Sequence, residues 1–318
     1  MTTKITQAAP ATKGQLKQLT RIIQDALPDT KWIEELLTRL SLDKDSAQKL
    51  IESGNALHEV RKFLADKVRE LSDSAMYADQ VVESTYGYLS RPIDEQIAVL
   101  RQYDWGREID WTINEVQQQL LAKPAPQGSE GYFAVVFDQT MVTDYEENPG
   151  VDQSGPVTLA LNALSKQRDG RLVNYREGEL GPQYYRRSKK SAEKMKQLWE
   201  SQGCPTGIIL IPSQFCIKHH GKSVLRARVV IRGTKFPLDA YETIQMVLTH
   251  ENRLKHYDDL WLDLPGAEYS HGSAGFPVGF FSRNMVGLMF HGDEVWFGFC
   301  VSGLAVCYYG SVSGFLPQ

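Results

Sequence analysis

The sequence predicts a mixed α+β protein, with an N-terminal helical region followed by an α+β domain that ends in short β-strands. Up to about residue 122, apolar residues recur at three- and four-residue steps, as in amphipathic helices. The segment 123–131 (KPAPQGSEG) is rich in Pro, Gly and Ser, a composition typical of linkers. Beyond it, aromatic and β-branched runs indicate strands. The expected parts are therefore 1–122, 123–131 and 132–318.

In the helical region, apolar stripes predict helices on both sides of Asp29, a residue type that caps helices well. Two further helices are expected, from Asp43 to about Gly54 and from about 57 to 71. After the break at YGYLSRP, residues 93–103 and 109–122 again have a helical pattern. We interpret this region as a scaffold and a candidate module for homo-oligomerisation.

In the α+β domain, YFAVVF (132–137) has the composition of a buried strand. Helices are expected at 156–166, 188–201 and 238–250, and strands at 207–212, 224–231 and 260–264. From Pro265 onward, glycines separate short aromatic and β-branched runs. This pattern predicts short strands and hairpins with no helix.

Composition excludes several classes of function. The 318 residues carry 35 Lys and Arg against 39 Asp and Glu, a net charge of −4, so the whole-molecule field does not drive the protein onto nucleic acid or anionic lipid. No uncharged apolar stretch approaches the roughly 20 residues of a membrane span, and the first residues lack the apolar core of a secretory signal. The four cysteines are too few for a disulfide scaffold. We expect a cytoplasmic protein that makes no membrane contact.

No catalytic constellation stands out. Cys216 lies near His219 and His220, but no acidic residue is close enough in sequence to orient a catalytic ring. These residues lack the paired spacing of a metal site, and we interpret the histidines as surface residues after a strand. Asp258 and Asp259 precede a strand, where acids commonly form turns. Glycine-rich phosphate-binding motifs are absent, so we expect no enzyme activity, no metal and no cofactor.

Two basic clusters support an alternative function in nucleic-acid binding. They are RRSKKSAEKMK (186–196) and KHHGKSVLRARVVIRGTK (218–235). On the strand expected at 224–231, Arg226 and Arg228 would point to the same face, as contacts with backbone phosphates require. The candidate residues are Arg186, Arg187, Lys189, Lys190, Arg226, Arg228 and Arg232.

The C-terminal segment is the most unusual part of the chain. From Trp261 onward Arg283 is the only Lys or Arg, and FGFCVSGLAVCYY (297–309) carries no charge. Large aromatic residues stand beside glycines and small residues, without a clear packing period. The mixture favours an exposed surface like an antibody paratope, although a buried terminal hairpin is the alternative interpretation.

This segment resembles the ligand-binding end of C-type-lectin-like proteins that diversity-generating retroelements diversify. In that family, mutation of adenines in Asn codons creates the variation, and it cannot produce Lys, Glu, Gln, Met or Trp. Every residue of 297–309 belongs to the permitted set, whereas Met285, Met289, Glu294 and Trp296 do not and would be framework. The closing GSVSGFLPQ (310–318) would be the invariant end.

The resemblance implies a C-type-lectin-like domain that presents a hypervariable surface to a ligand. A protein ligand is favoured over a sugar, because sugar binding in lectin folds usually recruits Ca²⁺ through clustered acids and amides, and this segment has few acids. The implied contact residues are His271, Ser273, Phe276, Arg283, Asn284, Phe297, Phe299, Cys300, Ser302, Leu304, Val306 and Tyr308.

Overall fold

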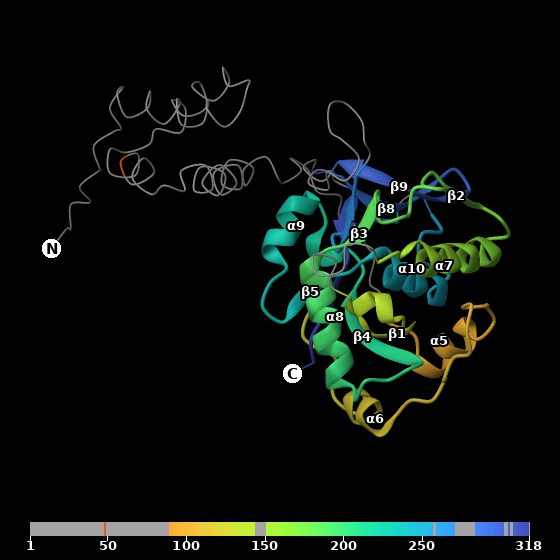
Figure 1. Ribbon diagram of the computed structural model, residues 1–318, viewed down its shortest axis with the longest axis vertical. Helices are drawn as coiled ribbons and strands as arrows, with labels where there is room; N and C mark the ends of the chain where they lie inside the picture. The colour runs from red at the N-terminus through yellow and green to blue at the C-terminus, as the bar shows by residue number, and fades with distance from the viewer. Residues whose placement is uncertain are drawn as a thin grey trace, which may run out of the picture. The chain divides into compact units, whose positions relative to one another are not determined.

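The computed structural model describes residues 48, 89–143, 151–256, 259–270, 284–301, 305 and 308–317. The chain divides into two compact units, Met1–Ser74 and Ala75–Gln318, and the architecture below is that of the second unit. It combines helices with two β-sheets (Figure 1), which confirms the α+β class. The helices expected before residue 74 lie outside the described residues, except for Gln48, which is helical as expected. Among the described helices, none has the length and apolar character needed to cross a bilayer.

Two helices expected in the N-terminal helical region belong to this second unit. They are α5 (Ile93–Leu100) and α6 (Glu115–Leu121). The side chain of Gln96 on α5 donates to the carbonyl of Tyr132 and accepts from the amide of Ala134. α5 is thereby fixed to the first strand, so the compact unit begins well before the linker expected at 123–131.

The first sheet has four strands in the order β1-β4-β11-β5, and all neighbours are antiparallel. The strands are β1 (Gly131–Val136), β4 (Ile208–Gln214), β11 (Ser313–Phe315) and β5 (Lys235–Pro237). β4 is buried along its whole length and β1 along nearly all of it. The apolar runs that predict these two strands are those of strands buried on both faces.

The second sheet is built around a hairpin of β8 (Asn284–His291) and β9 (Glu294–Val301), which turns at Gly292. β6 (Trp261–Asp263) and β7 (Ala267–Tyr269) pair with the other edge of β8. The sheet is completed by β2 (Leu172–Asn174) parallel to β9, β3 (Tyr185–Arg187) antiparallel to β7, and β10 (Tyr309–Ser311) parallel to β6. From Pro265 onward the described residues contain no helix, as the sequence predicts.

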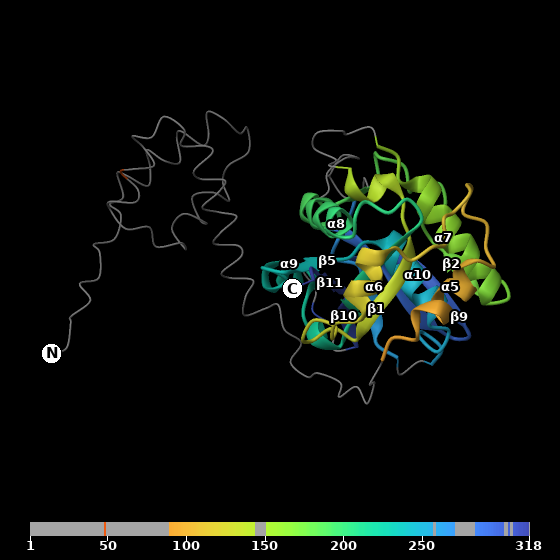
Figure 2. The ribbon, with the colours of Figure 1, turned by 90° about the horizontal axis from the view of Figure 1, so that it is seen from below.

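Three helices form where the sequence predicts them. They are α7 (Ser154–Gln167), α8 (Lys189–Ser201) and α10 (Ala240–Thr249). α10 is buried on all sides and packs against α7, α5 and β1, and Figures 1 and 2 show α7 and α10 side by side. Short 3₁₀ turns, η1 (Gln139–Val142) and η2 (Ile217–His219), follow β1 and β4.

The strand expected at 224–231 is wrong. The segment forms a helix, α9 (Val224–Val230), whose first turn is capped by the side chain of Ser223. Its buried residues are Val224, Ala227 and, just after the helix, Ile231. This spacing of three and four residues is helical, and packing of that stripe outweighs the β-propensity of the valines.

Candidate functional site

The outer side of the second sheet carries a row of large, partly exposed side chains. Along β9, Val295 and Phe297 face the core while Trp296 between them remains partly exposed. Along β8, Leu288 is buried and its neighbour Met289 is partly exposed. Because side chains alternate between the faces of a strand, the partly exposed residues share the face opposite the core.

Side-chain contacts join these residues into one surface across several strands. Trp261 on β6 meets Tyr308 and Tyr309 edge to face, with ring centroids 4.8 and 5.0 Å apart. The hydroxyl of Tyr309 donates to the sulfur of Met289 over 3.0 Å, and Met289 lies directly opposite Trp296 in the hairpin. We call Trp261, Met289, Trp296, Tyr308 and Tyr309 the aromatic face.

Trp296 is held in place from both sides at the far end of this face. The ring of His291 stacks on it at 4.4 Å, and the exposed Tyr175 meets it edge to face at 5.3 Å. Its indole nitrogen donates to Glu294 over 3.2 Å. These contacts fix the orientation of a bulky side chain that is only partly covered.

A pair of glycines, Gly287 and Gly298, lies at one register position of the hairpin. No side chain stands on the sheet there, and a Cβ added at Gly298 would lie 3.1 Å from the terminal methyl of Met289. Both glycines are buried, and the methyl of Met289 occupies the space above Gly298. The glycine pair therefore lets Met289 lie across this part of the sheet.

The contact residues that the resemblance implies differ in their exposure to solvent. Phe297 was expected to be exposed, and this is wrong, because its side chain is completely buried. Tyr308 is exposed over 40% of its surface, as expected. Asn284 lies in β8, and Phe299 and Cys300 lie in β9, but their side chains are outside the described part. So are His271, Ser273, Phe276, Arg283, Ser302, Leu304 and Val306.

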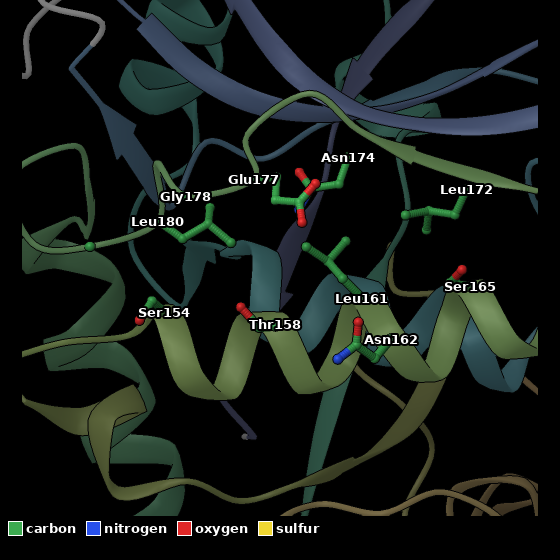
Figure 3. Close-up of a pocket in the computed structure, with 11 residues that line it drawn as sticks. Ser154, Thr158, Leu161, Asn162, Ser165, Leu172, Asn174, Glu177, Gly178 and Leu180 are labelled. Atoms are coloured by element: carbon green, nitrogen blue, oxygen red, sulfur yellow. The ribbon is translucent and has the colours of Figure 1, made fainter. Parts of the chain in front are cut away.

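A pocket of about 550 Å³ opens between α7 and the segment that follows it (Figure 3). Asn174 and Glu177 point toward the helix, and Thr158 and Leu161 point back toward them. The other lining residues are Ser154, Asn162, Ser165, Leu172, Gly178, Leu180 and Gly181. The lining offers hydroxyls, amides and one carboxylate but no cation, so it suits a neutral or cationic polar group better than an anion.

The loop that closes this pocket is fixed to β7. A guanidinium nitrogen of Arg176 lies 2.7 Å from a carboxylate oxygen of Glu179 and donates to the hydroxyl of Tyr269 over 2.9 Å. Tyr269 in turn donates to Glu179. Burial, together with the bond to Glu179, raises the pKa of Tyr269 to about 12. The pocket wall is therefore held by three mutually bonded side chains.

The candidate catalytic groups do not form a site. The sulfur of Cys216 accepts a hydrogen bond from Arg253 over 2.7 Å, and burial raises its thiol pKa to about 12, so it is a protonated core residue and not a nucleophile. His219 is buried, which corrects the expected surface position. Asp259 accepts from the amides of Lys255 and His256, the turn role expected for it, while Asp258 lies outside the described residues. No group of metal-ligating side chains occurs in the described ranges.

Several residues of the nucleic-acid alternative are engaged within the protein. Arg187 is buried and paired with Asp239 and Glu242, and Arg186 is paired with Glu268 at 2.8 Å.

The two arginines placed on one strand face lie instead on α9, which corrects that expectation. Arg228 donates to the carbonyls of Pro265 and Ala267, and Arg226 is half-buried on the same helix. Lys189, Lys190 and Arg232 lie at the start of α8 and just after α9.

Comparison of the chain with protein-family models, curated proteins and solved structures gives no match.

Proposed function

We propose that this chain is a non-enzymatic binding protein that takes a protein ligand on its aromatic face. The observation that carries the proposal is the continuous set of partly exposed Trp, Tyr and Met side chains across β6, β8, β9 and β10. Aromatic residues and Met are enriched in protein interfaces, and Trp and Tyr dominate their hot spots.

The strands that carry the face favour tight binding. Trp296 and Met289 lie on a hairpin whose strands are paired along eight register positions, and Tyr309 pairs with Trp261. Side chains fixed in this way lose little conformational entropy when a partner binds, so more of the contact energy contributes to affinity. An aromatic surface without a cation-binding cluster in the described ranges also fits a protein ligand better than a Ca²⁺-dependent sugar.

The binding proposal is tested by capture from an extract of the source cells. The double variant Trp296→Ala, Tyr308→Ala removes two anchors, and Val116→Ala, 43% exposed on α6, is the matched control. The proteins retained by wild type and control should be depleted at least tenfold with the double variant, since loss of one hot spot costs about 2 kcal/mol or more. Equal retention by all three proteins would contradict the proposal.

We further propose that a diversity-generating retroelement varies this surface. Trp296 and Met289, which adenine mutation of Asn codons cannot create, would be constant anchors, and Tyr308 would be a variable one. The test is genomic: a reverse transcriptase gene should lie beside a near-copy of the 3′ end that differs only at adenines. Sibling sequences should differ mainly within 269–309 and agree over 310–318, and differences spread evenly along the chain would refute diversification while leaving the binding proposal standing.

A further inference from the structure

A second surface, independent of the aromatic face, is formed by basic residues from three separate segments. They are Lys190 and Lys194 on α8, Lys218 and Lys222 around η2, and Arg232 and Lys235 before and at the start of β5. We call these six residues the basic strip. Figures 1 and 2 show α8, α9 and β5 together on one side of the unit.

Hydrogen bonds place one half of the strip. The ammonium group of Lys190 donates to the carbonyl of Ile231, which brings α8 against the residue that precedes Arg232. Lys194 lies one helical turn beyond Lys190 and so projects from the same face of α8. The amide of Lys235 donates to the carbonyl of Arg232 over 3.3 Å, and this turn leads to the other half.

In the second half of the basic strip, Lys235 and Lys218 lie beside Phe315. Lys235 is its partner in the register of β5 with β11, and the ammonium nitrogen of Lys218 lies 5.5 Å from the centre of its ring. The ammonium group of Lys222 donates to the carbonyl of Lys218 over 3.3 Å. The six cations therefore form a continuous series from Lys194 to Lys222.

Five of the six cations in the strip are not neutralised by a carboxylate in the described part of the chain. Lys190, Lys194, Lys218, Arg232 and Lys235 form no ion pair with a carboxylate in the described ranges. Burial lowers the pKa of Lys190, and the charges of Lys194 and Arg232 lower it further. The second effect is repulsion between neighbouring cations of the strip. A polyanion would relieve this repulsion.

A buried histidine lies at the same place. His219 is 4% exposed, and neither ring nitrogen has a hydrogen-bond partner among the described residues. Burial, and then the charges of Lys222, Lys218 and Lys235, lower its pKa to about 3. Burying a polar ring without a hydrogen-bond partner costs stability. Because this ring lies among three lysines, we interpret this end of the strip as a candidate binding site and not as an ordinary solvated surface.

We propose that the basic strip binds the phosphate backbone of nucleic acid without reading its sequence. Lysines bind phosphate oxygens as point charges, without the fixed two-bond geometry of arginine, and a linear series of cations matches the closely spaced charges of a nucleic-acid strand. The ring within the strip, Phe315, is only 2% exposed and cannot stack on bases. The exposed large apolar residues of the described ranges (Leu89, Val116, Tyr175 and Tyr308) lie on other segments, so the strip offers no apolar wedge for insertion into a membrane.

The experiment is fluorescence anisotropy of the full-length chain with a labelled random-sequence DNA duplex at several salt concentrations between 50 and 200 mM. With about five phosphate contacts, the logarithm of the association constant should fall with the logarithm of salt with a slope of about −4 to −5. The variant Lys194→Gln, Arg232→Gln, Lys235→Gln should reduce the size of the slope by about 3 and weaken binding at 100 mM salt more than tenfold. Lys166→Gln on α7, outside the strip, should leave the slope unchanged.

Thermal melting of each variant checks that the fold survives, and Lys218→Gln alone, which should change the slope by about 1, replaces the triple variant if that variant melts early. The proposal is overturned if the wild type does not bind DNA at 50 mM salt. It is also overturned if the variants within the strip have the same salt slope as the wild type. It is also overturned if phosphatidylserine vesicles or polyglutamate compete as well as the same DNA without label, since the partner would then be a membrane or an acidic protein.

Discussion

At the scale of single residues, a buried ion cluster joins β3 to α10. Both terminal nitrogens of the Arg187 guanidinium lie 2.8 Å from the carboxylate oxygens of Glu242, and its third nitrogen lies 3.3 Å from Asp239. All three side chains are almost completely hidden from solvent. Burial, which Arg187 offsets only in part, raises the pKa of Asp239 to about 6. Each charge in such a cluster depends on its partners.

Replacing Arg187 with Met should destabilise the fold by about 3 to 5 kcal/mol, because two buried carboxylates lose their counter-charge. The control is Arg186→Met, which breaks a partly exposed pair with Glu268 and should cost about 1 kcal/mol or less. Urea unfolding followed by circular dichroism measures both. A similar loss of unfolding free energy in the two variants would contradict the larger contribution expected from the buried cluster.

His250 provides a prediction about pH. Its ring accepts from the amide of Arg91 over 3.0 Å and donates to the carbonyl of Met246 over 2.9 Å, so the neutral ring is satisfied on both sides. Burial lowers its pKa from 6.5 to about 4, and the charge of Arg91 adds to this. Because the folded-state pKa lies below the unfolded value, the stabilisation is complete above pH 6.5 and is lost as the pH falls toward 4.

The shift corresponds to roughly 3 kcal/mol of acid destabilisation from this one group. His250→Gln keeps a hydrogen-bonding side chain but cannot titrate, so its unfolding free energy should fall less steeply than that of the wild type between pH 7 and pH 4. Chemical denaturation at a series of pH values measures the difference, in which the other titrating groups cancel. Parallel curves for the two proteins would be the contradictory outcome.

At the scale of elements, the end of the chain connects the two sheets. β10 pairs with β6 in the second sheet, and after Val312 the chain continues as β11 in the first sheet. Gly310 lets β10 pass close to η2, since an added Cβ would lie 2.5 Å from the carbonyl oxygen of Cys216. The obstructing atoms belong mostly to the backbone, which cannot move aside without cost.

Gly310→Ala should therefore destabilise the protein by roughly 1 to 3 kcal/mol. Its control is Gly155→Ala in the first turn of α7, where no atom lies within 4 Å of an added Cβ and where the change should stabilise the helix by up to about 1 kcal/mol. Differential scanning calorimetry should show the two melting temperatures shifting in opposite directions. A shift of the same sign in both variants would contradict the close approach.

Much of the element pattern follows from the sequence. Continuous apolar runs predict β1 and β4 because both strands are buried, and helical stripes predict α7, α8 and α10. The segment 224–231 could not be assigned in this way, because its valines favour a strand while the cap at Ser223 and the buried stripe produce a helix. Two neighbouring signals there predict different structures, and tertiary packing decides between them.

For the aromatic face too, the local sequence predicts only part of the structure. The sequence points to the C-terminal strands, but it assigns Phe297 to the surface and Trp296 to the framework, and the exposed fractions of the two residues are the reverse. The alternation of strand residues leaves two choices of face, and only the packing of Val295 and Phe297 into the core settles which one is outward. All six residues of the basic strip lie in the two basic clusters of the sequence, 186–196 and 218–235. The sequence does not show that the fold brings the two clusters together, as the bond from Lys190 to the carbonyl of Ile231 does.

At the scale of the whole molecule, the two proposed surfaces belong to different sheets. The aromatic face lies on the second sheet, and the basic strip borders β5 and β11 of the first. The continuation of β10 into β11 gives both surfaces one common support. We expect variants of one surface to leave the binding properties of the other unchanged, as is usual for sites that share no side chain.

Hydroxyl-radical labelling of the full-length protein, read by mass spectrometry, shows whether the aromatic face is available to a partner. Trp261, Met289, Trp296, Tyr308 and Tyr309 should be oxidised faster than aromatic and Met residues that the structure buries, with Phe297, which is 0% exposed, and Met246 as internal references. A captured ligand should slow the oxidation of these five residues together. If Trp296 and Tyr308 react no faster than aromatic side chains of the core, the aromatic face is covered and cannot be the binding surface.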